Sequence, residues 1–259
     1  IGNSLQSVLG EEIVQIRELL PLLEKAGEAY LQQKLQLLHT ELEPELTQKL
    51  LLLSGGNPIL LDLAVEWQVR QIPLDWLLKI SVNDLQSISD EEMKTKRSEF
   101  ERQLVLHIAQ LRSQLDNLIL LISRVYPLDI DAISSLLRIS EADTKKLVDD
   151  AKTLVFVKVL PDGRLTLHDE MRRMVNEYVW SEIDPESDRR RRDSKRIITY
   201  LEKKIQVLTE QIDTLEKKEE TAGEKGEPET EIEAFIKREG FLREIWGLNG
   251  EYLKHALFV

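Results

Sequence analysis

The chain has 259 residues, of which 42% are hydrophobic and 32% are charged. It contains no cysteine, which excludes disulfide bonds and thiolate metal sites. The formal net charge is −12, which argues against a nucleic-acid partner because duplex binding depends on neutralising phosphates with basic side chains.

The length leaves room for two or three small domains. No apolar run approaches the roughly 20 residues that a membrane-spanning helix needs, and no signal peptide opens the chain. We therefore expect a cytoplasmic location and no membrane partner. The four histidines lie far apart in sequence, so no metal site is predicted. Because the first residue is Ile1 and not Met, we expect the natural protein to begin upstream.

Residues 1–18 read as a linker or as the end of a preceding domain. Residues 19–80 predict a compact helical bundle with apolar residues at helical spacing. Gly55 and Gly56 end one helix of this bundle, and Pro58 suits the first position of the next. Residues 81–98 are polar and predict a linker or a loosely packed helix.

Residues 99–182 carry a winged-helix pattern. Three helices are expected over residues 100–125, 129–137 and 141–152. A period of two then predicts a strand over residues 154–160, followed by an Asp-Gly turn, a second strand at 165–167 and a helix over residues 168–180. The third helix is acidic, so it would be repelled by DNA phosphates. We interpret the domain as a packing module, with no nucleic acid as partner.

Residues 183–259 begin with a basic cluster flanked by acidic residues, which we interpret as a solvated helix start. A seam of apolar residues follows at spacings of three and four, over fewer than three heptads: Ile198, Leu201, Ile205, Leu208, Ile212 and Leu215. Residues 221–230 predict a flexible loop, after which apolar residues return. The segment is expected to form a helical hairpin or the start of a helical-repeat array, and the fold class is mainly α.

The sequence contains no complete catalytic constellation. It lacks a G-x-x-x-x-G-K-[ST] phosphate loop and a nucleophile-elbow serine. No catalytic residue is therefore assigned.

Two short motifs carry a family resemblance. Ser54-Gly55-Gly56-Asn57-Pro58 resembles the glycine–x–proline motif in the helical lid of STAND-class signal-transduction NTPases, which are relatives of NLR receptors and AP-ATPases. Leu167-His168-Asp169 is similar to the Met-His-Asp motif that closes the winged-helix domain of that family, with Leu in place of Met. The resemblance covers about residues 10–180 and identifies residues 1–18 with the end of a nucleotide-binding domain.

The resemblance implies a molecular switch that binds ADP or ATP. Pro58 would lie against the adenine, His168 would reach the β-phosphate, and Asp169 would steady the local turn. The phosphate loop and the Walker-B acids are missing from this chain, so they and the Mg²⁺ would belong to an upstream nucleotide-binding domain. Whether the protein is an enzyme therefore stays uncertain. ADP would hold the modules closed, and exchange for ATP would release them near residues 81–98 and allow homo-oligomerisation.

The residues alone leave other interpretations open. Pro58 also fits an ordinary helix start, and His168 also fits a side chain that packs at the beginning of a helix. The alternative function is a non-enzymatic winged-helix scaffold or transcriptional regulator with a coiled-coil arm.

Overall fold

The computed structural model describes residues 21–72, 74–110, 113–125, 127–225 and 228–259. This part of the chain is mainly helical and has one small antiparallel sheet of two strands, so the expected fold class is confirmed at that level. Residues 1–18, expected to be a linker or a domain end, lie outside the described residues. The chain divides into two compact units, which we call the N-terminal unit (residues 1–104) and the C-terminal unit (residues 105–259).

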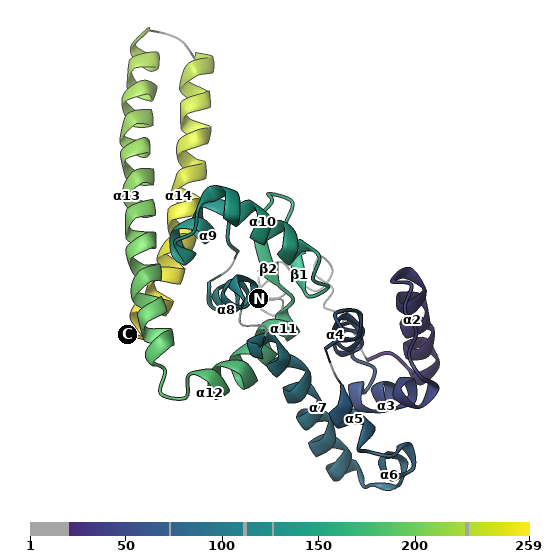
Figure 1. Cartoon of the computed structure of the whole chain (residues 1–259). Coiled ribbons are helices and arrows are strands. Elements are labelled where there is room, and N and C mark those ends of the chain that lie inside the picture. The colour runs from purple at the N-terminus through teal and green to yellow at the C-terminus, as the bar shows by residue number, and fades with distance from the viewer. Residues whose placement is uncertain (1–20, 73, 111–112, 126, 226–227) are drawn as a thin grey trace. The chain divides into compact units, whose positions relative to one another are not determined.

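The N-terminal unit is built from helices, labelled in Figure 1. They are α2 (Glu24–Leu37), α3 (Pro44–Ser54), α4 (Pro58–Val69), α5 (Asp75–Leu78), α6 (Val82–Ser87) and most of α7 (Asp90–Gln110). Helix α4 is the core of this unit, because every side chain from Leu60 to Trp67 is buried and it contacts both α2 and α3. The Trp67 indole N–H donates to the Leu104 carbonyl oxygen at 2.8 Å, which ties α4 to α7.

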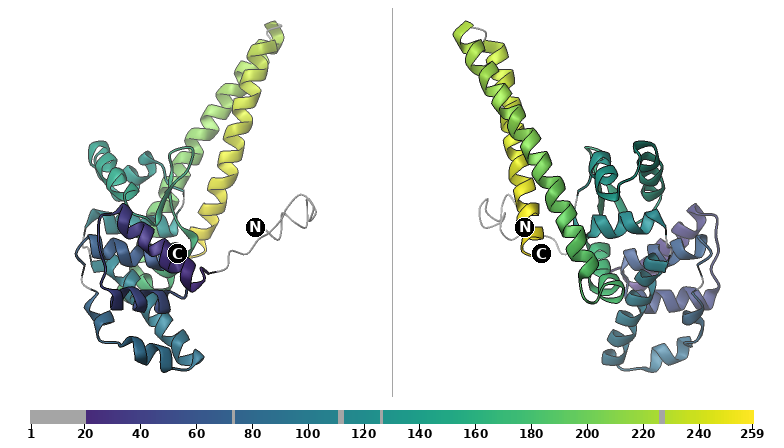
Figure 2. Two further views of the ribbon diagram at one scale, coloured as in Figure 1. Left: turned by 90° about the vertical axis from the view of Figure 1, so that its right-hand side faces the viewer. Right: turned by 60° about the vertical axis from the view of Figure 1, so that its left-hand side comes forward.

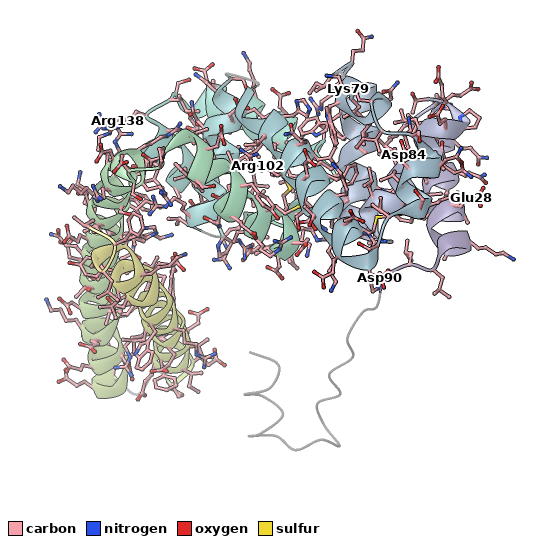
Figure 3. The ribbon with its side chains drawn as sticks, turned by 90° about the horizontal axis from the view of Figure 1, so that it is seen from below. Glu28, Lys79, Asp84, Asp90, Arg102 and Arg138 are labelled. Carbon is pink, nitrogen blue, oxygen red and sulfur yellow. The ribbon has the colours of Figure 1, made fainter. Side chains whose placement is uncertain are left out.

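Residues 81–98, for which a linker or a loosely packed helix was expected, are helical over most of their length. Ser81 caps α6 by accepting a hydrogen bond from the Asp84 N–H at 3.0 Å. At the start of α7, Ser89 and Glu92 bond each other's backbone N–H groups reciprocally, at 3.0 and 3.3 Å. The side chains of Asp84 and Asp90 point outward (Figure 3), as expected for helices with many polar residues.

The C-terminal unit begins with the last residues of α7. It continues through α8 (Gln114–Arg124), α9 (Ile130–Leu137), α10 (Glu141–Lys152), β1 (Val157–Val159), β2 (Leu165–Leu167), α11 (Asp169–Met174), the π-helical turn η1 (Val175–Val179), α12 (Trp180–Ile183), α13 (Asp188–Lys225) and α14 (Pro228–Ala256). Helix α9 is followed by its C-cap Arg138, which has a left-handed backbone conformation and an exposed side chain (Figure 3).

The single helix predicted over residues 100–125 is wrong, because α7 ends at Gln110 and α8 begins at Gln114. The start of α8 is fixed by a capping box. The Ser113 N–H donates to the Asp116 carboxylate at 3.2 Å, and the Ser113 side chain caps the helix in return. The apolar periodicity of the sequence continues across this break, so it predicted one helix although the capping box marks the start of a second.

The two strands form the expected hairpin. Val157 pairs with Leu167 and Val159 pairs with Leu165, and the turn between the strands places Gly163 at a φ of 83°. The first strand is shorter than the predicted residues 154–160. Leu128, between α8 and α9, also pairs with Leu165 through two backbone hydrogen bonds of 2.8 and 3.0 Å.

Helices α13 and α14 lie side by side along most of their length (Figures 1 and 2). Of the predicted seam, Leu201, Leu208 and Ile212 are buried. The flexible loop predicted over residues 221–230 is wrong in extent, because α13 continues through residue 225 and α14 starts at Pro228. Gly223 and Glu224 remain helical, since Ala222 is buried within the hairpin and packing outweighs weak helix propensity.

Candidate functional site

Gly55 and Gly56 form a sharp turn between α3 and α4. Their φ angles are 58° and 80°, in the region that glycine adopts without steric penalty. The turn also lies against the backbone of Leu22, whose N–H donates to the Gly56 carbonyl oxygen at 2.9 Å. A Cβ atom added to Gly56 would stand only 2.2 Å from the Leu22 carbonyl oxygen. The close packing of this loop therefore requires glycine at residue 56.

Pro58 is the first residue of α4. Asn57 caps the helix, because its side-chain oxygen accepts a hydrogen bond from the Ile59 N–H at 3.0 Å. Proline suits this position because it has no N–H to satisfy and its φ is already helical. The Pro58 side chain is half-buried. Pro58 therefore begins a helix in the structure, and part of its ring is exposed to solvent.

His168 stands at the junction of β2 and α11. Its N–H donates to the Phe156 carbonyl oxygen at 3.0 Å, and its carbonyl oxygen accepts from the Arg172 N–H at 2.9 Å. His168 occupies the N-cap position of α11, but the cap has no side-chain hydrogen bond. The backbone of His168 therefore joins the hairpin to the helix, while the half-buried imidazole is not used to cap it.

The side chain of Arg172, one turn into α11, stabilises the junction between β2 and α11. One of its terminal nitrogens pairs with the Asp169 carboxylate at 3.0 Å. The other donates to the Thr166 hydroxyl at 2.9 Å and to the Leu167 carbonyl oxygen at 3.1 Å. Arg172 is therefore a site residue that the sequence reasoning missed, although its spacing of three from Asp169 on a helix was an available signal.

Each motif is formed by its own unit. His168 and Asp169 are neighbours at one turn of the C-terminal unit, and Pro58 belongs to the N-terminal unit. The Asn57 side chain caps the helix that Pro58 begins, and backbone hydrogen bonds to Phe156 and Arg172 hold His168 at its turn.

The basic cluster expected at a solvated helix start lies at the beginning of α13. Asp184 organises it, since its carboxylate accepts from the backbone N–H groups of Arg189 and Arg190, both at 2.9 Å. The Arg190 side chain pairs with the same carboxylate at 3.1 Å. Burial raises the pKa of Asp184, but these hydrogen bonds outweigh it and hold the pKa below its usual value. Arg191, in contrast, is exposed and pairs with Asp188.

A second polar cluster is buried where α8, α13 and α14 meet, and the sequence analysis did not find it. The Arg124 guanidinium donates to the Ser194 hydroxyl at 2.7 Å, and Ser194 Oγ lies 3.1 Å from His255 Nδ1. The Arg124 carbonyl oxygen accepts from Lys254 Nζ at 2.7 Å. We call Arg124, Ser194 and His255 the buried polar cluster. No pattern in sequence links them, because 70 and 61 residues separate the bonded pairs.

The buried polar cluster depresses the pKa of its histidine. Burial, and after it the positive charges of Arg124 and Lys254, lower the pKa of His255 to about 4. The folded protein therefore holds this imidazole neutral near pH 7, while the unfolded chain protonates it near its ordinary pKa of about 6.5. Its preference for the neutral form stabilises the fold above pH 6.5, and this contribution is lost as the pH falls toward 4.

We expect the free energy of unfolding of the C-terminal unit to fall by about 2 kcal/mol between pH 7 and pH 5 because of His255 alone. The measurement is urea unfolding at both pH values, with the His255→Asn variant as reference, because asparagine keeps a polar group but does not titrate. The difference in pH dependence between the two proteins isolates His255. An equal loss of stability in both would contradict the assignment.

None of the described helices has an apolar stretch long enough to cross a membrane. Comparison with protein-family models, curated proteins and solved structures found no match to this chain.

Proposed function

We propose that this chain is the regulatory part of a nucleotide-switched signal-transduction ATPase of the STAND class. ADP keeps its modules closed, and exchange for ATP frees them to oligomerise and signal. The observation that carries the proposal is the turn at Leu167-His168-Asp169. There the Arg172 side chain and the His168 backbone fix the junction of strand and helix, with His168 at the first turn of α11.

The hairpin and the helices before it support a winged-helix domain over residues 99–182. Helices α8, α9 and α10 precede β1 and β2. The segment between α8 and α9 also joins the sheet, because Leu128 pairs with Leu165. This order is the one expected of a winged helix. The exposed charge of α10 includes Glu141, Asp143, Asp149 and Asp150, which favours a packing role over DNA binding.

The N-terminal unit supports the role of a helical lid over residues 19–80. Its glycine turn places Pro58 at the start of the most buried helix, so the proline ring is held on a rigid element. A rigid apolar ring of this kind offers an edge against which a nucleotide base can lie. Residues 183–259 then follow the winged helix as the helical hairpin of α13 and α14.

The residues present fit the nucleotide in chemical type. A histidine ring N–H donates to a phosphate oxygen, and the N–H groups at the start of a helix favour anions. Bound ADP or ATP supplies the phosphate charge that His168 recognises. The upstream nucleotide-binding domain, which is the proposed partner of this chain, supplies the phosphate loop and holds Mg²⁺. Such a nucleotide switch fits a cytoplasmic protein.

Replacing His168 with alanine in the full-length protein is expected to speed ADP release about tenfold or more. A charge-assisted hydrogen bond to phosphate contributes about 1.5–3 kcal/mol, and 1.4 kcal/mol is a factor of ten. The measurement is the off-rate of a fluorescent ADP analogue, read beside the oligomer distribution without added ATP. Faster release should accompany a larger oligomeric fraction.

The matched control is His39→Asn, because His39 has a φ of 50° that asparagine tolerates and it lies outside both motifs. His255 is unsuitable as a control because it is buried. An unchanged ADP off-rate in the His168→Ala variant would reduce His168 to a structural residue. A wild-type protein that binds no nucleotide would instead favour the non-enzymatic winged-helix scaffold.

A further inference from the structure

Helix α14 has two apolar faces, and α13 covers only one of them. The covered face includes the buried residues Ala234 and His255. The other face, continued by Leu257, whose N–H still bonds the Leu253 carbonyl oxygen just after the helix, carries large apolar side chains that are exposed: Ile232, Phe235, Ile236, Leu242, Trp246, Leu253 and Leu257. Trp246 and Leu257 are 83% and 90% exposed. We call these seven residues the outer stripe.

The outer stripe is continuous along the helix. Its residues recur at intervals of one, three, four, six and seven, which keeps them within about a third of the helix circumference at 3.6 residues per turn. From residue 232 to residue 257 the stripe is about 38 Å long at 1.5 Å per residue. Figures 1 and 2 show that α14 packs beside α13 along this length. The stripe therefore follows nearly the whole of α14.

The apolar exposure is specific to α14 and is not a general property of the hairpin. Within the described part of α13, Val207 is the large apolar residue that is exposed. Single exposed apolar residues are ordinary on protein surfaces, whereas a contiguous patch of several marks an interaction site. The outer stripe belongs to the second class.

We propose that the outer stripe pairs with the outer stripe of a second copy of this chain, with the two α14 helices antiparallel. The stripe is self-complementary about a point between Glu244 and Ile245. A two-fold axis at that point places Ile232 opposite Leu257 of the other copy. It places Ile236 opposite Leu253 in the same way, so the apolar residues at the two ends of the stripe cover each other.

Residues at the centre of the stripe are also complementary across this two-fold axis. Leu242 falls opposite Gly247, and Gly250 falls opposite Glu239. A Cβ atom added to either glycine would meet nothing within 4 Å in one copy, so both positions leave room for a side chain of the other copy. Trp246 falls opposite Arg243, where a guanidinium can lie over the indole.

A parallel pair of α14 helices is less favourable. In a parallel pair each residue faces itself, so Arg243 would oppose Arg243 and Glu239 would oppose Glu239. Like charges placed opposite one another in an interface cost free energy, and the antiparallel pair avoids both contacts. Antiparallel helices also set their dipoles in opposition, which is the favourable arrangement. The charges therefore select the antiparallel pair.

The first test is the mass of the 259-residue chain in solution by light scattering after size exclusion. The wild-type chain is expected at twice the 30.0 kDa of one copy at micromolar concentration, without added nucleotide. The Trp246→Glu variant is expected at the mass of one copy. Val207→Glu is the matched control, because it adds the same charge at an exposed apolar residue of α13 and should leave the dimer intact. A monomeric wild type, or a dimer that survives Trp246→Glu, overturns the proposal.

The absence of cysteine allows the direction of pairing to be tested by single introduced cysteines. Under oxidation by dissolved oxygen, an Ile236→Cys chain mixed with a Leu253→Cys chain should form a disulfide-linked dimer. Neither variant alone should cross-link comparably. Linking of Ile236→Cys with itself would indicate a parallel pair, and no linking in the mixture would show that the stripes do not meet. Either result overturns the antiparallel dimer, and neither bears on the nucleotide site at His168.

Discussion

Replacing Gly56 with alanine is expected to lower the free energy of unfolding of the N-terminal unit by about 3 kcal/mol or more. Two costs add. The φ of 80° is unfavourable for a residue with a Cβ, and the new Cβ would stand 2.2 Å from the Leu22 carbonyl oxygen and 2.9 Å from the Leu22 nitrogen. Because both atoms belong to the backbone, relief of the clash requires the Leu22 segment to move and its hydrogen bond to Gly56 to break.

The adjacent Gly55→Ala substitution is the matched control. Its φ of 58° is also positive, but its Cβ would meet the Arg97 guanidinium at 3.1 Å, and that flexible side chain can shift. We expect a cost of about 1 kcal/mol, close to the backbone penalty alone. Denaturant unfolding followed by hydrogen exchange of the α4 amides measures both variants. Equal costs at the two positions would mean that the contact with Leu22 is not a constraint.

Replacing Trp180 with alanine is expected to cost about 3–5 kcal/mol of stability in the C-terminal unit. The indole is 1% exposed, and its N–H donates to the Ser123 hydroxyl at 3.0 Å. The guanidinium groups of Arg124 and Arg189 each lie 5.6 Å from the indole centroid, where they interact favourably with its π-face. The Arg190 guanidinium adds a third such contact at 5.9 Å, so the alanine variant loses the buried ring, the hydrogen bond and three cation contacts.

Trp246→Ala is the control for this prediction, since the same side chain is removed from an exposed position. Its effect on the isolated chain is expected to stay within about 0.5 kcal/mol, measured by urea unfolding at concentrations too low for association. Trp180→Phe separates the contributions, because it keeps most of the ring and removes the hydrogen bond at a cost of about 1–2 kcal/mol. Comparable destabilisation by the two alanine variants would contradict the burial of Trp180.

Local signals in the sequence predicted much of the secondary structure. The Asn57-Pro58 start of α4 and the turn at Gly163 depend on backbone preferences of a few adjacent residues, and both form as expected. The apolar seam of α13 was also predictable, because Leu201 and Leu208 repeat with the period of the helix. The position of His168 between strand and helix follows from the same local pattern.

The errors arose where two signals of different range competed. The helix break before Gln114 depends on one serine and one aspartate, a signal weaker than the apolar period that runs across it. At residues 221–225 the reverse occurred, since glycine and glutamate predicted a loop but packing against α14 kept the helix. Propensities of a few tenths of a kcal/mol per residue decide such segments only where tertiary contacts do not.

The mainly helical class and the hairpin with its Asp-Gly turn could be predicted from local patterns of residues. The packing of Gly56 on Leu22, the burial of Arg124 beside His255 and the uncovered apolar face of α14 became visible only in the folded chain. The two groups of features differ in the sequence separation of the residues that interact. Caps, turns and periodicity act between residues a few positions apart, whereas burial and charge pairing depend on which distant segments meet.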